Sequence, residues 1–323
     1  MKRITALLLS AALVFSMTAC SKTATTDKDN NNKIKVVTTI FPAYDWVREV
    51  AGNDETVDCS MLLDNGVDIH SFQPSAEDIL KISECDLFIY VGGESDTWVT
   101  EVLSGNAKAD RKVISLMDLL KDEVKEEKTV EGMQEEDEHE DGDDAEYDEH
   151  VWLSLKMAQT AVSGIAEELS GLNSKDKEKY KSNAEAYNAK LSALDAQYKE
   201  TVDNAAQKTI VVADRFPFRY MADDYGIKYY AAFAGCSAET EASFETVVFL
   251  ADKIDEFGLK NVITLENNDH KIAETVISNS KEKNAEIKVL DSLQSVTSED
   301  VKAGSTYLSI MESNLKVLKE VLK

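Results

Sequence analysis

The chain alternates short apolar runs, typical of buried strands, with helical segments, and this alternation occurs twice. Strand-like runs in the first half are predicted at 33–40, 56–63, 86–91 and 112–115, with a helical segment at 76–84. In the second half, strands are predicted near 209–213, 228–232, 261–265 and 287–290. Strands that alternate with helices form parallel sheets covered by helices. We therefore predict an α/β fold with two βα lobes, each built on a parallel-type sheet.

Two longer helices are predicted between the strand-rich halves, at 155–172 and 175–205. The second helix carries apolar and aromatic residues at alternating spacings of four and three, which places them on one helical face. They are Tyr180, Ala184, Tyr187, Leu191, Leu194 and Tyr198. At 1.5 Å per residue this helix would span about 45 Å, enough to link both lobes.

The N-terminus is typical of a bacterial lipoprotein signal peptide. Lys2 and Arg3 precede an apolar run that is too short for a spanning helix, and small residues precede Cys20. We expect cleavage before Cys20, a lipid on that residue, and a chain anchored to the cell membrane outside the cytoplasm. The alternative is a secreted protein with a free N-terminal thiol.

The predicted organisation follows from these patterns. The segments in order are a signal peptide (1–19), a flexible tether (20–32), an N-terminal α/β lobe (33–121), an acidic disordered loop (122–149), a helix completing the first lobe (150–174), a linking helix (175–206) and a C-terminal α/β lobe (207–323). The 304 residues after the signal peptide are enough for two lobes with a core each.

The charge is strongly negative and unevenly distributed. The chain has 61 acidic and 35 basic residues, and this balance argues against nucleic-acid binding, which requires a basic surface. Residues 122–149 alone hold 16 acidic and two basic residues. Such a segment repels itself and offers little to a core, so we predict a disordered loop. It is either a solvated insertion or, with His139, a weak collector of divalent cations.

Three cysteines follow Cys20, and an odd number leaves at least one unpaired. They are Cys59, Cys85 and Cys236. Cys59 and Cys85 lie on or next to predicted strands that could be neighbours in a sheet. A disulfide between these two residues and three free thiols are both compatible with the sequence.

Two of the four histidines stand in distinctive phrases at predicted strand-to-helix junctions. His70 lies in V-D-I-H-S-F-Q-P-S and His150 in D-E-H-V-W-L. Neutral imidazole is a common ligand of zinc and similar metals. We predict that both histidines bind one cation between the lobes, whereas His139 and His270 are more simply interpreted as non-ligand residues.

These motifs resemble those of the substrate-binding lipoproteins of zinc and manganese ABC transporters, known as cluster A-I. The resemblance covers nearly all of the mature chain, and includes T-T-I-F-P-A-Y-D, both histidine phrases, V-L-D-S-L and G-S-T-Y-L-S-I-M-E-S-N-L. It implies two lobes joined by a long helix, with a metal site in the cleft between them. It also implies that His70, His150 and Asp291 are metal ligands.

The chain departs from this family at the third ligand, which is usually His and sometimes Glu. Alignment places Arg215 there, or less favourably Asp214. A guanidinium cannot coordinate a cation, so Arg215 is expected to pair with an acidic neighbour or to point away from the cleft. Glu239 is the first candidate for a replacement ligand, with Glu241 and Glu266 after it. Otherwise water fills the position.

The resemblance implies capture and delivery of a metal rather than catalysis. The chain would bind a divalent cation with high affinity and pass it to an ABC permease driven by its ATPase. The ligand set suits zinc and manganese alike. The acidic loop resembles in position the charged loop of zinc binders, which favours zinc, with manganese as the alternative. Two other functions are a metal-dependent hydrolase acting through metal-bound water and a surface adhesin with a structural metal. The sequence contains neither H-E-x-x-H nor G-x-S-x-G, which argues against the hydrolase.

Overall fold

The structure is a computed structural model that describes residues 33–52, 55–105, 108, 110–134, 146–237 and 241–322. The predicted signal peptide, Cys20 and the tether lie outside these residues, as do His139 and Glu239. Within the described ranges, no helix combines the length and apolar character needed to cross a membrane.

The first lobe is built on a parallel sheet with the strand order β2-β1-β3-β4. Its strands are β1 (Ile34–Thr38), β2 (Val57–Met61), β3 (Leu87–Tyr90) and β4 (Lys112–Ser115). The connections contain α1 (Phe41–Ala51), η1 (Ile69–Ser71), α2 (Ala76–Glu84), η2 (Glu94–Asp96), α3 (Trp98–Ser104) and α4 (Leu116–Leu119), where η denotes a 3₁₀ turn. The central strands are apolar because helices cover both faces of such a sheet.

The second lobe repeats this arrangement, with the strand order β6-β5-β7-β8 and parallel pairing throughout. The strands are β5 (Thr209–Arg215), β6 (Lys228–Phe233), β7 (Asn261–Leu265) and β8 (Glu286–Leu290). The helices are α7 (Arg219–Tyr225), α8 (Phe244–Phe257), α9 (Lys271–Asn279), α10 (Ser298–Ala303) and α11 (Tyr307–Val321). β5 continues two residues beyond its predicted end, to Arg215.

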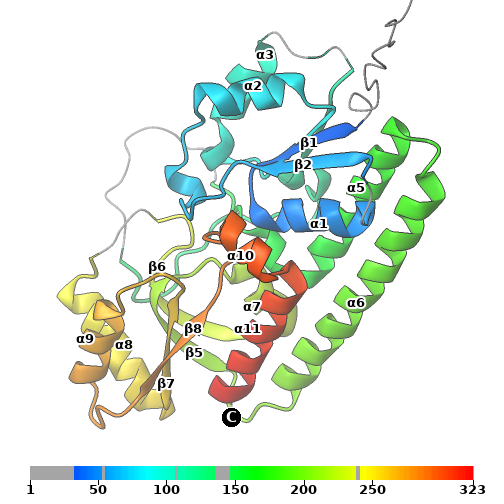
Figure 1. Ribbon diagram of the computed structural model, residues 1–323. Coiled ribbons are helices and arrows are strands. Elements are labelled where there is room, and N and C mark those ends of the chain that lie inside the picture. The colour runs from blue at the N-terminus through cyan, green and yellow to red at the C-terminus, as the bar shows by residue number, and fades with distance from the viewer. Residues whose placement is uncertain are drawn as a thin grey trace, which may run out of the picture. The chain divides into compact units, whose positions relative to one another are not determined.

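Two antiparallel helices join the lobes, as Figure 1 shows. They are α5 (Leu155–Leu172), which follows the short turn η3 (Val151–Leu153), and α6 (Lys177–Asp203). α6 contacts α1 of the first lobe and both α7 and α11 of the second, and its predicted apolar face is buried. The Asn183 side chain donates to the carbonyl of Val50 (2.9 Å), and the Tyr198 hydroxyl donates to the carbonyl of Met311 (2.6 Å). These contacts confirm the linking helix.

The structure differs from the predicted disorder at both ends of the acidic segment 122–149. Met133 is 7% exposed, and the amide of Gln134 donates to the carbonyl of Ala232 in β6 (2.9 Å). Glu126 and Tyr147 form an isolated antiparallel bridge. The few apolar side chains of the segment are thus sufficient to dock residues 122–134 on the second lobe. Residues 135–145 lie outside the described part of the chain.

The three cysteines after Cys20 are free thiols. Cys59 lies in β2, whereas Cys85 ends α2 just before β3. β1 separates β2 from β3 in the sheet, so these strands are not the neighbours that a disulfide would have required.

Candidate metal centre

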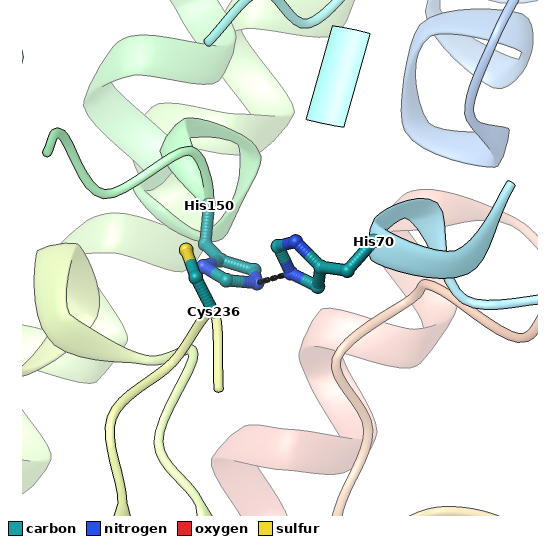
Figure 2. A group of neighbouring side chains, drawn as sticks. All are labelled: His70, His150 and Cys236. Atoms are coloured by element: carbon teal, nitrogen blue, oxygen red, sulfur yellow. Dashed lines mark hydrogen bonds between the residues drawn. The ribbon is translucent and has the colours of Figure 1, made fainter. Parts of the chain in front are cut away.

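His70 and His150 come from segments 80 residues apart and face each other. Their Nε2 atoms are 3.4 Å apart, as the dashed line in Figure 2 marks. His70 belongs to η1, in the connection that follows β2, and His150 is the residue before η3. The ring of His150 is fully buried and that of His70 is largely buried. The structure therefore brings together the two histidines that the sequence singled out.

Contacts on the far side of the His70 ring orient it. Nδ1 of His70 lies 2.7 Å from the hydroxyl oxygen of Ser95, in η2. The amide of Ser95 donates in turn to the carboxylate of Glu149 (2.8 Å), and the amide of His70 donates to Asp68 (3.0 Å). With Nδ1 engaged in this way, Nε2 remains the atom directed at His150.

A carboxylate orients the His150 ring. Oδ1 of Asp148 accepts from both Nδ1 and the amide of His150, each at 2.9 Å. A carboxylate only accepts hydrogen bonds, so Nδ1 carries the hydrogen, and in the neutral form of the ring Nε2 has the lone pair. The hydroxyl of Tyr220 donates to the carbonyl of Asp148 (2.7 Å) and helps to hold this loop. A histidine supported by a carboxylate is a common arrangement around protein-bound metals.

Cys236 provides a third donor atom that the sequence reasoning missed. Among the described residues, the donor atoms of Cys236, His70 and His150 all lie within 4.8 Å of one another (Figure 2). Cys236 follows β6, and its amide donates to the carboxylate of Glu127 in the described part of the acidic segment (2.9 Å). Cys236 stands three residues before Glu239 in the phrase G-C-S-A-E-T, so the sequence did place a second possible donor there.

Burial sets the protonation of this group. It lowers the pKa of His70 to about 3, and the nearby His150 ring adds to the effect. The His70 ring is therefore neutral at physiological pH, as metal coordination requires. Burial also raises the pKa of the Cys236 thiol, with the carboxylate of Glu127 as the next cause.

Arg215 pairs with a carboxylate, as expected. Its Nη2 lies 2.5 Å from Oδ2 of Asp68 in the first lobe, and its Nη1 donates to the carbonyl of Ser237 (3.4 Å). Burial opposes ionisation of Asp68, but the Arg215 guanidinium holds the pKa of that carboxyl below its usual value. Asp214 instead accepts from the amide of Leu265 (3.0 Å) and the side chain of Asn268 (2.6 Å). Arg215 thus links the lobes beside His70.

Asp291 is not part of the three-donor group. It follows β8, and its carboxylate accepts from the amide of Leu293 (2.8 Å). Burial raises the pKa of Asp291 to about 7, with the Glu266 carboxylate as the next cause. The indole of Trp152 donates to the carbonyl of Ser292 (2.9 Å), which ties the Asp291 loop to the segment that carries His150.

The remaining candidate carboxylates have other surroundings. Glu266 accepts from the amide of Ser292 (2.8 Å) and from its hydroxyl (2.6 Å), which uses both of its oxygens. Glu241 is exposed and lines a cavity of about 870 Å³ beside the three-donor group. Asp68 and His70 from the first lobe line the same cavity, as does Arg215 from the second. The histidine pair therefore adjoins a cleft with walls from both lobes.

His270 lies apart from the histidine pair. Its Nδ1 is 3.0 Å from the hydroxyl oxygen of Thr264 in β7, and its backbone adopts a left-handed conformation before α9. These contacts fit the structural, non-ligand role that the sequence suggests for His270.

Comparison with known proteins is consistent with this geometry. The family model of the zinc-uptake complex component A, periplasmic, matches residues 36–321. The chain belongs to this family. The family assignment confirms the resemblance read from the motifs, and the two-lobed α/β fold agrees with it.

Individual relatives match along almost the whole chain. The zinc-binding lipoprotein AdcA of Streptococcus pneumoniae serotype 4 is 35% identical over 99% of this chain and 61% of its own length. The high-affinity zinc uptake system protein ZnuA of Bacillus subtilis is 30% identical over 99% of this chain and 98% of its own. The crystal structure of the Zn(II)-bound ZnuA-like domain of S. pneumoniae AdcA superposes with a TM-score of 0.69, with 32% identity over 90% of this chain and 99% of that domain. The chain thus spans about six-tenths of the AdcA protein.

Proposed function

We propose that this chain is an extracytoplasmic receptor that binds a divalent transition metal and delivers it to an ABC permease for import. The observation that carries the proposal is the convergence of the two Nε2 atoms of His70 and His150, each ring fixed by a partner at Nδ1. Both rings are largely or fully buried, and their Nε2 atoms face each other where one cation could bind to both.

The spacing of these nitrogens suits zinc. With Zn–N bonds of about 2.0–2.1 Å and tetrahedral angles, two histidine nitrogens stand about 3.3–3.4 Å apart. The observed separation is 3.4 Å. The names of the relatives, zinc-binding lipoprotein and high-affinity zinc uptake protein, support zinc as the first candidate for the cargo. Manganese is the next candidate.

Asp291 is proposed as the carboxylate ligand from the second lobe. It stands outside the three-donor group, so it would join after the loop behind β8 moves towards His150. The hydrogen bond from Trp152 to Ser292 keeps this loop adjacent to the site. Glu239 also remains a candidate ligand, since the structure does not describe it.

The proposed partners follow from the receptor function. A lipid on Cys20 would keep the chain at the outer face of the cell membrane, where a permease with its ATPase receives the metal. The chain is proposed to catalyse no reaction, because a shell closed by protein ligands leaves no position for a reactive water.

A metal titration tests this proposal. The purified chain, stripped of metal by a chelator, is titrated with zinc and with manganese against a competing chelator, and its metal content is measured by elemental analysis. We expect one zinc per chain, bound more tightly than manganese. Substoichiometric zinc, or hydrolytic turnover that depends on metal, would contradict the receptor function.

A further inference from the structure

The second lobe approaches the histidine pair through the loop that follows β6. Gly235 permits this approach, because a Cβ atom there would lie 3.0 Å from the carbonyl oxygen of Phe216 and 3.3 Å from two ring atoms of His150. Any larger residue would push the loop away from the His150 ring. The next residue, Cys236, thereby places its sulfur next to the His150 ring (Figure 2), and donor atoms of Cys236, His70 and His150 all lie within 4.8 Å of one another.

Two side chains hold this loop in position. The carboxylate of Glu127 accepts from the amide of Cys236 (2.9 Å), and the guanidinium of Arg215 donates to the carbonyl of Ser237 (3.4 Å). Arg215 also binds Asp68, which accepts from the amide of His70. Arg215 therefore fixes the loops of two donors at once, although it cannot donate to a metal itself.

We propose that the Cys236 thiolate is the third metal ligand of this chain and that it makes the site selective for zinc over manganese. The inference rests on the proposed receptor function and specifies the cargo. In this arrangement the thiol at position 236 takes the role of the third ligand that the motif resemblance implies at position 215, and Arg215 serves as a positioning residue.

The distances suit this assignment. With a Zn–S bond of about 2.3 Å, the nitrogen-to-sulfur edge of a zinc tetrahedron is about 3.6 Å. The donor atoms already lie within 4.8 Å of one another, so their separations would have to shorten by about 1.2 Å at most to complete the geometry.

The chemistry of sulfur determines the selectivity. Thiolate is a soft ligand that favours zinc, whereas manganese favours carboxylate and water oxygens. When zinc binds, the S–H bond of Cys236 breaks, its electron pair forms the Zn–S bond, and the proton passes to solvent. The thiolate also cancels one of the two positive charges brought into a buried site.

Cobalt(II) provides a direct test, since it substitutes for zinc and shows sulfur-to-cobalt charge-transfer absorption in the near ultraviolet only when a thiolate is bound. The parent chain and a Cys59→Ser control should both show this band, and Cys236→Ser should lack it. Zinc affinity should fall by more than about 100-fold in Cys236→Ser, since loss of a mere outer-shell partner already costs about 10–100-fold. Manganese affinity should change far less.

X-ray absorption at the zinc edge of the parent protein tests the same bond without any variant, so a folding defect in Cys236→Ser cannot obscure the result. Sulfur scattering at about 2.3 Å supports the proposal. A shell of nitrogen and oxygen alone, or unchanged zinc affinity in Cys236→Ser, would overturn the thiolate ligand and leave the receptor function intact. A parent chain that binds neither zinc nor cobalt would instead overturn the proposed function.

Discussion

The two lobes share one architecture but contribute different chemistry to the same site. In each sheet the second strand along the chain, β2 or β6, lies at an edge next to the first strand, β1 or β5. A donor residue follows each of these edge strands: His70 follows β2 and Cys236 follows β6. Such positions lie beyond the carboxyl ends of the strands, where parallel sheets commonly bind ligands. The fold therefore determines where a donor residue can lie, and the type of side chain at that position determines which metal the donor favours.

The donor residues of the two lobes are held in place by different types of hydrogen bond. His70 and His150 are held through their rings, by Ser95 and Asp148. Cys236 is held through its backbone, by Glu127. A thiol has no second ring atom to engage, so its loop must be fixed instead. We therefore expect the partners of His70 and His150 to tune the donor strength of the two rings, whereas Glu127 fixes the Cys236 loop and, after burial, also raises the pKa of its thiol.

The largest expected effect on zinc affinity comes from the removal of an imidazole. His150→Ala should lower zinc affinity by more than about 100-fold, since loss of an outer-shell partner alone costs about 10–100-fold. His270→Ala is the matched control, because His270 contacts Thr264 and lies outside the three-donor group. Calorimetry at fixed pH with a competing chelator measures both. Equal affinity of the His150→Ala variant and the parent would refute the assignment of His150 as a ligand.

A smaller loss of zinc affinity is expected when the carboxylate that supports the His150 ring is removed. Asp148→Asn keeps the shape of the side chain but removes the charge that strengthens the His150 ring as a donor, so zinc affinity should fall about 10–100-fold. Ser95→Ala should cost less, because the hydroxyl carries no charge. The two variants are compared in the same competition assay. A greater loss in Ser95→Ala would mean that His70, rather than His150, is the more strongly tuned ligand.

Arg215→His tests whether a donor at a different position of the second lobe can replace Cys236. In the Cys236→Ser background it should restore part of the lost zinc affinity, because it supplies a nitrogen at the position where the motif resemblance implies a third ligand. Arg215→Lys is the control, since it keeps a cation near Asp68 but adds no metal donor. Affinities of both double variants are measured by competition. If Arg215→Lys restores as much affinity as Arg215→His, the gain comes from charge and not from a new ligand.

The smallest effect concerns stability in the first lobe. Asp96 accepts from the amides of Val91 and Gly92, and burial raises its pKa to about 7. The raised pKa means that Asp96 stabilises the fold fully below about pH 4 and that this contribution is lost as pH rises through about 7. Asp96→Asn should therefore remove a pH slope of at most about 1.4 kcal/mol per unit from the free energy of unfolding.

Urea unfolding of the parent and Asp96→Asn between pH 5 and 8 measures this slope. Asp214→Asn is the counterpart in the second lobe, where a buried carboxylate with a raised pKa also accepts from a strand amide. Parallel stability curves for parent and Asp96→Asn would show that Asp96 does not titrate in this range.

The sequence by itself predicted the strands of both sheets and the helices α2, α5 and α6, because a buried strand is a short apolar run and these helices have a capped start or a periodic apolar face. α2, for example, begins at Ser75 with a capping box that Asp78 completes, and it spans the predicted residues. The remaining differences lie at the ends of elements, as with β5 and α6. The family and the two histidines also followed from local phrases, since a ligand loop requires several neighbouring residues of fixed type.

Only the tertiary structure revealed the rest, because it depends on which distant segments meet. Nothing local distinguishes Cys236 from Cys59 as a donor; the difference is the distance from its sulfur to His70 and His150. The partner of Arg215 lies 147 residues away, in the other lobe. Composition predicted a disordered acidic segment, yet one buried methionine and a few backbone hydrogen bonds order its start. Composition averages over a segment, whereas packing is decided by single side chains and the surfaces that they reach.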